Sequence, residues 1–74
     1  MAGKYPVLTG RKLLRILRKH GCVVLRQKGS HVLVQCEAYS TIIPVHAREE
    51  LGRGLLRAIE RDLEPCLGKG WLAP

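Results

Sequence analysis

The sequence predicts an α+β fold of order α-β-β-β-α, in which two helices cover one face of a three-stranded antiparallel sheet. Two segments have the spacing of apolar residues that is typical of helices. Between them lie three short segments rich in Val, Ile and Leu, separated by turn residues, as expected of consecutive strands. Both helices need a surface on which to bury their apolar sides, which predicts a two-layer arrangement.

The first helix is predicted to begin after Thr9, which can cap it, and to end at Gly21. One side of this helix is apolar and a second side is cationic, the latter formed by Arg11, Arg15 and Arg18. His20 falls at the C-terminal end, where the helix dipole favours a protonated imidazole, and we interpret it as structural.

The second helix is predicted over about residues 54–63, with Pro65 blocking its continuation. We expect residues 1–74 to form one domain, with a core of about residues 7–63 and a tail at 64–74. The tail has no periodicity, so two outcomes stay open: Trp71 packs on the body of the domain, or the tail frays.

The strands are expected at about residues 22–28, 31–36 and 41–46. A two-residue turn at Gly29-Ser30 would pair Lys28 with His31 and Arg26 with Leu33. Further along, it would pair Leu25 with Val34 and Val23 with Cys36. A three-residue loop would instead bury Arg26 among valines, which is costly for an unpaired charge, so we favour the two-residue turn.

For the second hairpin we take residues 37–40 as the loop, which places His31 opposite His46. One face of the sheet is then the core, formed by Val23, Leu25, Val32, Val34, Cys36, Ile43 and Val45. The other face is open and carries Arg26, Lys28, His31, Leu33, Gln35, Ile42, Pro44 and His46. Because opposed side chains are about 4.5–5.5 Å apart at Cβ, the two imidazoles are expected to reach one ligand.

The charge is unevenly distributed. The chain has 13 Lys and Arg against 6 Asp and Glu, and residues 1–36 hold eight of the basic residues and none of the acidic ones. An excess confined to one half of a folded domain favours a polyanionic partner over a role in solubility alone.

Cys22, Cys36 and Cys66 are odd in number and lack a C-x-x-C spacing. This pattern argues against disulfides and against a structural zinc site, and we expect free thiols, with Cys22 and Cys36 buried. There is no apolar run long enough to span a membrane and no pattern of a signal peptide, so we expect no membrane association and a cytoplasmic location.

Three stretches in this order, "LTGRKLLRILRKHGCVVLRQKGSHVLV", "IIPVH" and "ELGRGLLRAI", resemble the HicA (YcfA-like) toxins of bacterial type II toxin–antitoxin systems. The resemblance covers about residues 7–63. It implies a fold like that of double-stranded-RNA-binding domains, cleavage of mRNA without the ribosome, and neutralisation by a HicB-like antitoxin. The key histidine of the family follows Gly-Ser and corresponds to His31, which Gly29 and Ser30 present. His46 matches a position that is often histidine.

Two features depart from the family. Many members read Gly-Ser-His-His, whereas Val32 stands here in place of the second histidine. The segment after residue 63 is longer and more acidic than usual, so no role is carried over to it.

The resulting hypothesis is a metal-independent endoribonuclease with no cofactor, since residues 1–36 lack the carboxylates of a two-metal site. His31 would act as general acid or base, with His46 as a secondary catalytic candidate. The residues expected to bind RNA are Arg11, Arg15, Arg18, Arg26, Lys28, Gly29 and Ser30. The alternatives are a non-catalytic RNA-binding module of the same fold and a protein that binds an acidic protein partner.

Overall fold

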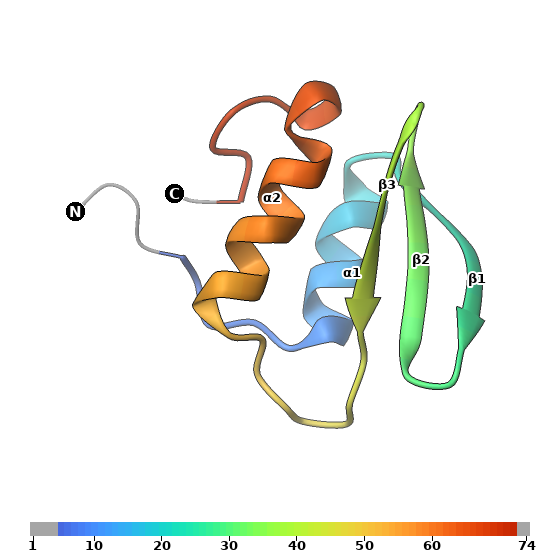
Figure 1. Cartoon of the computed structure of the whole chain (residues 1–74), viewed down its shortest axis with the longest axis vertical. Helices are drawn as coiled ribbons and strands as arrows, with labels where there is room; N and C mark the ends of the chain where they lie inside the picture. The colour runs from blue at the N-terminus through green and yellow to red at the C-terminus, as the bar shows by residue number, and fades with distance from the viewer. Residues whose placement is uncertain (1–4, 73–74) are drawn as a thin grey trace.

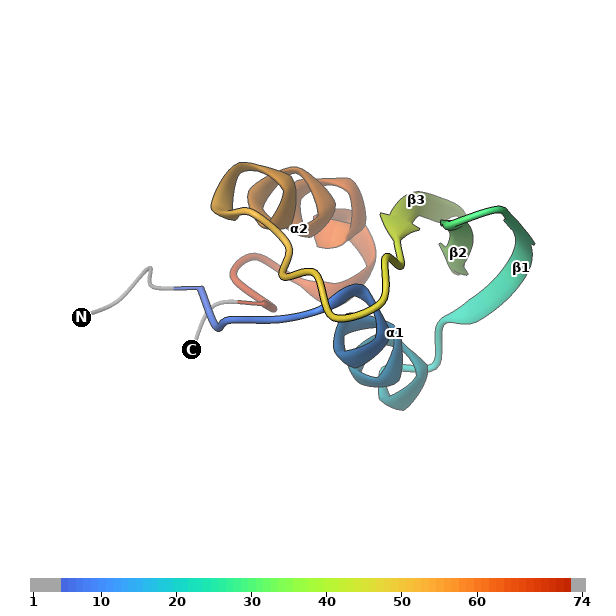
Figure 2. The ribbon, with the colours of Figure 1, turned by 90° about the horizontal axis from the view of Figure 1, so that it is seen from below.

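The computed structural model describes residues 5–72; residues 1–4 and 73–74 of the expected domain lie outside this range. The elements are α1 (Gly10–Lys19), β1 (Val23–Lys28), β2 (His31–Cys36), β3 (Tyr39–Pro44) and α2 (Arg53–Leu67). The strands form one antiparallel sheet in the order β1-β2-β3 (Figure 1). Both helices lie on the same side of this sheet (Figure 2), so the predicted fold class is confirmed.

Helix α1 has the predicted limits. The Thr9 side chain accepts a hydrogen bond from the Lys12 N–H, which caps the start of the helix. At the other end, Gly21 has a φ of 87° and its N–H donates to the Arg18 carbonyl. The left-handed conformation favours glycine and ends the helix there.

The first residue of α1 packs directly on the end of β3. A Cβ atom added to Gly10 would lie 2.1 Å from the Pro44 carbonyl oxygen, far inside van der Waals contact. Only a glycine therefore lets the helix backbone approach the strand this closely. This contact fixes the position of the α1 N-terminus relative to the sheet.

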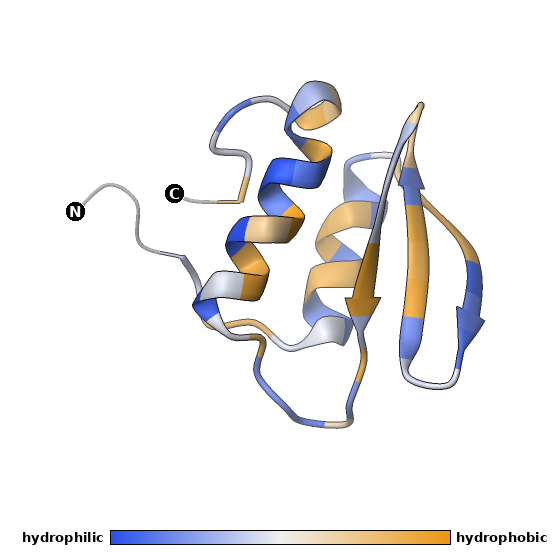
Figure 3. Ribbon diagram, viewed as in Figure 1, coloured by the Kyte–Doolittle hydropathy of each residue, from blue (hydrophilic) through white to orange (hydrophobic). Residues whose placement is uncertain are grey.

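The core lies between the two helices and the sheet, and the hydrophobic segments of the helices and of β2 and β3 border this space (Figure 3). The helices contribute Leu13, Leu17, Leu56, Ile59 and Leu63, and the sheet contributes Val32, Val34, Cys36 and Ile43. The predicted core was wrong for Val23 and Leu25, whose exposed fractions are 54% and 51%.

A β-bulge explains why these two residues are exposed. The two-residue turn is as predicted: Lys28 lies opposite His31, and Arg26 lies opposite Leu33. Beyond Arg26 the register shifts by one, so Val24 faces Val34 and Leu25 is the extra residue. The predicted pairing of Leu25 with Val34 and of Val23 with Cys36 is therefore wrong. The shift pairs Val23 with Gln35, so Val23 lies on the open face, while Val24 takes the core-facing position and packs against the core.

The second hairpin also differs from the prediction. Its turn consists of two residues, Glu37 and Ala38, because Glu37 adopts a φ of 57°. The strand consequently begins at Tyr39, and the register is two residues away from the predicted one. Since side chains alternate along a strand, a slip of two keeps every residue on its predicted face. His31 lies opposite Pro44, however, and the predicted pairing of His31 with His46 is wrong.

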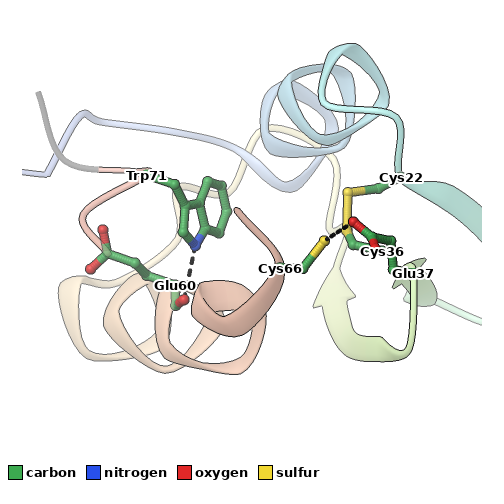
Figure 4. The surroundings of a disulfide bond; sticks show 6 residues. All are labelled: Cys22, Cys36, Glu37, Glu60, Cys66 and Trp71. Carbon is green, nitrogen blue, oxygen red and sulfur yellow. Dashed lines mark hydrogen bonds between the residues drawn. A yellow bond between two sulfur atoms is a disulfide. The ribbon is translucent and has the colours of Figure 1, made fainter. Parts of the chain in front are cut away.

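Cys22 and Cys36 form a disulfide (Figure 4), so the prediction of free thiols is wrong for this pair. Both residues are buried, as predicted. Their Cα atoms are 4.4 Å apart because the connection after α1 runs beside the end of β2. An odd number of cysteines leaves one unpaired, here Cys66, and does not exclude a bridge between the other two.

Helix α2 continues through Pro65 to Leu67, so the prediction that Pro65 stops the helix is wrong. Contacts after the proline hold the last turn in place. The Cys66 thiol donates to the Glu37 carboxylate across 3.2 Å, and the Gly68 N–H donates to the Glu64 carbonyl. Partial burial and this hydrogen bond to Glu37 raise the pKa of the Cys66 thiol.

The segment after α2 packs on the domain, which resolves the two outcomes left open for Trp71. The Trp71 Nε1–H donates to the Glu60 carbonyl at 2.8 Å, and the Trp71 ring meets the His20 ring edge to face. The buried Glu60 carboxylate also accepts hydrogen bonds from the Tyr5 hydroxyl and the Leu72 N–H. One side chain of α2 thus holds segments from near both ends of the described chain. The hydrogen bond to Glu60 raises the pKa of Tyr5.

Replacing Gly10 with alanine is expected to lower the free energy of unfolding by about 2–3 kcal/mol, because the added methyl group collides with the β3 backbone. The measurement is urea denaturation followed by circular dichroism. Gly54→Ala is the control, since no atom lies within 4 Å of its added Cβ, and it should raise stability by about 0.5–1 kcal/mol. Equal stabilities for the two variants would contradict the close approach at Gly10.

The disulfide predicts a specific count of reactive thiols. Alkylation of the protein unfolded without reductant should label Cys66 alone, and prior reduction should expose all 3 cysteines to the reagent. Removing the bridge by Cys22→Ser is expected to cost about 3 kcal/mol of unfolding free energy, whereas Cys66→Ser should cost much less. Labelling of three thiols without reductant would show that the bridge does not form.

Candidate functional site

A cavity of about 570 Å³ lies on the open face of the sheet, beside the β1–β2 turn. Its lining consists of Arg26, Lys28, Gly29, Ser30, His31, Leu33 and Ile42. Cavities that bind small ligands have volumes in this range. The structure therefore brings together five residues that the sequence singled out, from Arg26 to His31.

Strand pairing arranges these side chains in two rows across the sheet. Lys28, His31 and Pro44 are opposite one another in the row nearest the turn. Arg26, Leu33 and Ile42 form the next row, two residues further along each strand, or about 7 Å away. The first row contains the His31 imidazole, and the second is mainly apolar. The cavity therefore has one polar end and one mainly apolar end.

The turn that presents His31 is held by hydrogen bonds to the carbonyl groups of its two residues, Gly29 and Ser30. Gly29 has a φ of 59° and Ser30 does not have a positive φ, which fits a type II′ turn. The Gln27 side-chain amide donates to the Gly29 carbonyl at 2.9 Å, and the Val45 N–H donates to the Ser30 carbonyl at 2.6 Å. Sequence reasoning missed Gln27; the available signal was an amide side chain two residues before a glycine turn.

His46 lies outside the cavity that contains His31. It follows β3, and its Nε2 atom is 3.4 Å from the Ser30 Oγ atom. It lines a smaller hollow of about 230 Å³ together with Glu49 and Glu50. The two histidines are therefore at the same end of the molecule and on either side of Ser30, and they do not face each other across the sheet.

The arginines of α1 form a second cationic surface. Arg11, Arg15 and Arg18 are exposed and line a hollow of about 270 Å³ with Leu14. None of them lines the His31 cavity. Gly10 packs on Pro44, which lies opposite His31. This surface therefore begins beside the end of β3 on the helix side of the sheet, whereas the cavity lies on the open face.

The charged side chains that line the cavity are all basic. Among the described residues, those that line it include Arg26 and Lys28 but no acidic side chain. Residues 5–72 also contain no group of three or more His, Cys, Asp or Glu side chains that could hold a metal ion. The cavity therefore favours an anionic ligand.

These features define a small α+β domain with a histidine and two cations on an open sheet face. The comparison with protein families then identifies the group. The chain belongs to the family described as HicA toxin of bacterial toxin–antitoxin systems, whose model matches residues 10–64. The matched region begins with α1, includes the whole cavity and extends into α2. Searches of curated proteins and of solved structures found no significant match.

Family membership implies that an antitoxin partner exists. It also confirms the family resemblance proposed from the sequence. Within residues 5–72, neither helix is long and apolar enough to cross a lipid bilayer.

Loss of the Gln27 amide should loosen the turn while leaving the rest of the fold intact. We expect Gln27→Ala to cost about 1 kcal/mol, the usual net contribution of one hydrogen bond, and to speed tryptic cleavage after Lys28. Gln35→Ala, on the neighbouring strand, is the control. Equal rates of cleavage after Lys28 in the two variants would show that Gln27 does not restrain the turn.

Proposed function

We propose that this chain is a metal-independent endoribonuclease that cleaves mRNA, with His31 as a general acid or base. The observation that carries the proposal is the cavity in which His31 stands opposite Lys28 and next to the row that contains Arg26. An imidazole titrates near neutral pH, and cations beside it favour a bound phosphate. Membership of a toxin family supports the same conclusion.

The reaction would use a nucleophile supplied by the RNA. The ribose 2′-oxygen attacks the adjacent phosphorus, forming an O2′–P bond and breaking the P–O5′ bond. A base removes the 2′-hydroxyl proton, and an acid protonates the departing 5′-oxygen. His31 takes one of these two roles. Lys28 and Arg26 stabilise the negative charge that develops on the phosphate oxygens.

His46 is the secondary candidate for the other proton transfer. It lies beyond β3, and its imidazole is 3.4 Å from the hydroxyl of Ser30, which lines the cavity. Two arrangements fit this position: a proton relay through the Ser30 hydroxyl, or movement of the His46 ring when RNA binds. Ser30 is part of the proton path only in the first arrangement.

The arginines of α1 would bind the RNA backbone outside the cavity. Arg11, Arg15 and Arg18 are exposed and form a stripe along α1 that begins beside the end of β3. Such contacts release counterions, so binding should weaken as salt increases.

The physiological partner would be a HicB-like antitoxin acting in the cytoplasm, where mRNA is found, and its acidic groups would cover this basic surface.

The position of His46 supports a second candidate, a non-catalytic RNA-binding module. Because His46 is not opposite His31, the cavity contains one titratable imidazole and two cations. Such a site would bind a phosphate without transferring two protons. This candidate predicts retention of RNA without shortening of it.

Cleavage of a single-stranded RNA in EDTA tests the proposal. We expect His31→Ala to lower the rate at least about 100-fold, which is the usual contribution of a general acid or base. His31 is exposed, so its replacement should leave stability unchanged. His20→Ala, a histidine outside the cavity, is the control and should cut at the wild-type rate.

Three outcomes would contradict the proposal. Undiminished cutting by His31→Ala would remove this residue from catalysis. Loss of wild-type cutting in EDTA would indicate a metal-dependent reaction. Continued cleavage at a site with a 2′-deoxy nucleotide would exclude the 2′-hydroxyl as nucleophile.

A further inference from the structure

The second row of the cavity contains an apolar pair, in which Ile42 is exposed and Leu33 is half-buried. Leu33 and Ile42 lie opposite each other on β2 and β3, so their side chains are adjacent. The exposed fraction of Ile42 is 53%, which is high for a branched aliphatic residue. Arg26 completes the row on the other side of Leu33. We call Leu33 and Ile42 the apolar floor.

The lining of the cavity is chemically complementary to a nucleotide. Its cationic end, with Lys28 and His31, is complementary to a phosphate, and the apolar floor begins about 7 Å away along the strands. In a nucleotide, a flat base with two apolar faces is attached to the phosphate through the ribose. Covering an aliphatic pair with such a face removes both surfaces from water.

We propose that the apolar floor binds the base of an unpaired nucleotide next to the scissile phosphate. The base lies flat on Leu33 and Ile42, and the Arg26 guanidinium contacts it from the adjacent strand. The proposal rests on the proposed function for the identity of the ligand as RNA, but it does not depend on cleavage. In a duplex both faces of each base are covered by its neighbours, so only single-stranded RNA can present a free face.

The size and charge of the cavity favour a nucleotide over a protein partner. Within the cavity the apolar floor consists of two side chains with cations on the β1 side, which is enough for one planar group. On the β3 side the two residues also line a shallower hollow with Leu55 and Ala58 of α2. A stable protein interface normally buries more than about 1,000 Å². The other exposed aliphatic residues of the sheet, Val23 and Leu25, are not part of the cavity lining.

The test compares two variants with matched exposure. Ile42→Ser removes half of the apolar floor, whereas Val23→Ser changes a strand residue of nearly equal exposure, 54%, outside the cavity. The probe is a short, unstructured RNA that carries 2′-O-methyl groups throughout, so that binding is measured without cleavage. We expect Ile42→Ser to weaken binding about tenfold, as for the loss of one stacked base, and Val23→Ser to leave it unchanged.

Removal of single bases gives an independent readout. An abasic nucleotide moved along the probe should weaken wild-type binding about tenfold at one position. At that position the abasic probe should bind Ile42→Ser no more weakly than the intact probe does, because both changes remove the same contact. The same RNA annealed to its complement should bind wild-type protein more weakly than the single strand at equal salt.

Several results would overturn the proposal. Equal effects of the two serine variants, no sensitive abasic position, or tighter binding of the duplex would each exclude a base on the apolar floor. If Ile42→Ser binds RNA normally but escapes neutralisation by the antitoxin, the floor is a protein-binding surface and the proposal is wrong. If wild-type protein binds the probe with these properties but never cuts unmodified RNA, this proposal holds and the proposed catalysis fails. If it does not bind RNA, both are wrong.

Discussion

The geometry of the cavity depends on a backbone junction at the end of β3. There the Val45 N–H donates to the Ser30 carbonyl at 2.6 Å, and the Pro44 carbonyl is in close contact with Gly10. The first contact ties the end of the sheet to the turn that presents His31. The second brings the start of α1 to the same place. Three segments that are distant in sequence are thereby held together by main-chain groups, which leaves the side chains of His31, Lys28 and Arg11 free for a ligand.

The fold and the faces of β2 and β3 were predictable because they follow from residue periodicity and from the glycine turn. The even alternation of β3 explains why Ile42 and Ile43 were assigned to the correct faces although the register was two residues off. What determined that register was the left-handed conformation of Glu37, which is uncommon for a residue other than glycine and has no sequence signal here. The bulge at Leu25 depends in the same way on backbone twist in the assembled sheet. Within the candidate site, the grouping of residues from Arg26 to His31 could be predicted from the local sequence. The location of His46 could not, because it depends on the pairing register of β2 and β3.

The structure separates two kinds of basic surface that the charge count had combined. Arg26 and Lys28 stand on the open sheet beside a titratable group, while the arginines of α1 form an exposed stripe without one. The first arrangement suits chemistry at one phosphate, and the second suits a longer polyanion. The stripe begins where Gly10 meets β3, at the end of the sheet that also holds His31, so an RNA strand that passes around this end would contact both surfaces. The disulfide and the α2 contacts lie elsewhere and maintain the scaffold.

The interactions of Glu60 bear on the order in which the chain assembles. Its carboxylate meets the Tyr5 hydroxyl across 55 residues of sequence, whereas both hairpins close through turns of two residues. The entropy lost on closing a loop grows with its length, so the hairpins form at lower entropic cost than the Tyr5–Glu60 contact. We therefore expect the sheet with its open face to form early and the fastening of both outer segments to α2 to come late. The same segments are then the first to detach in local unfolding. Their amide hydrogens would exchange with solvent while the His31 cavity stays assembled.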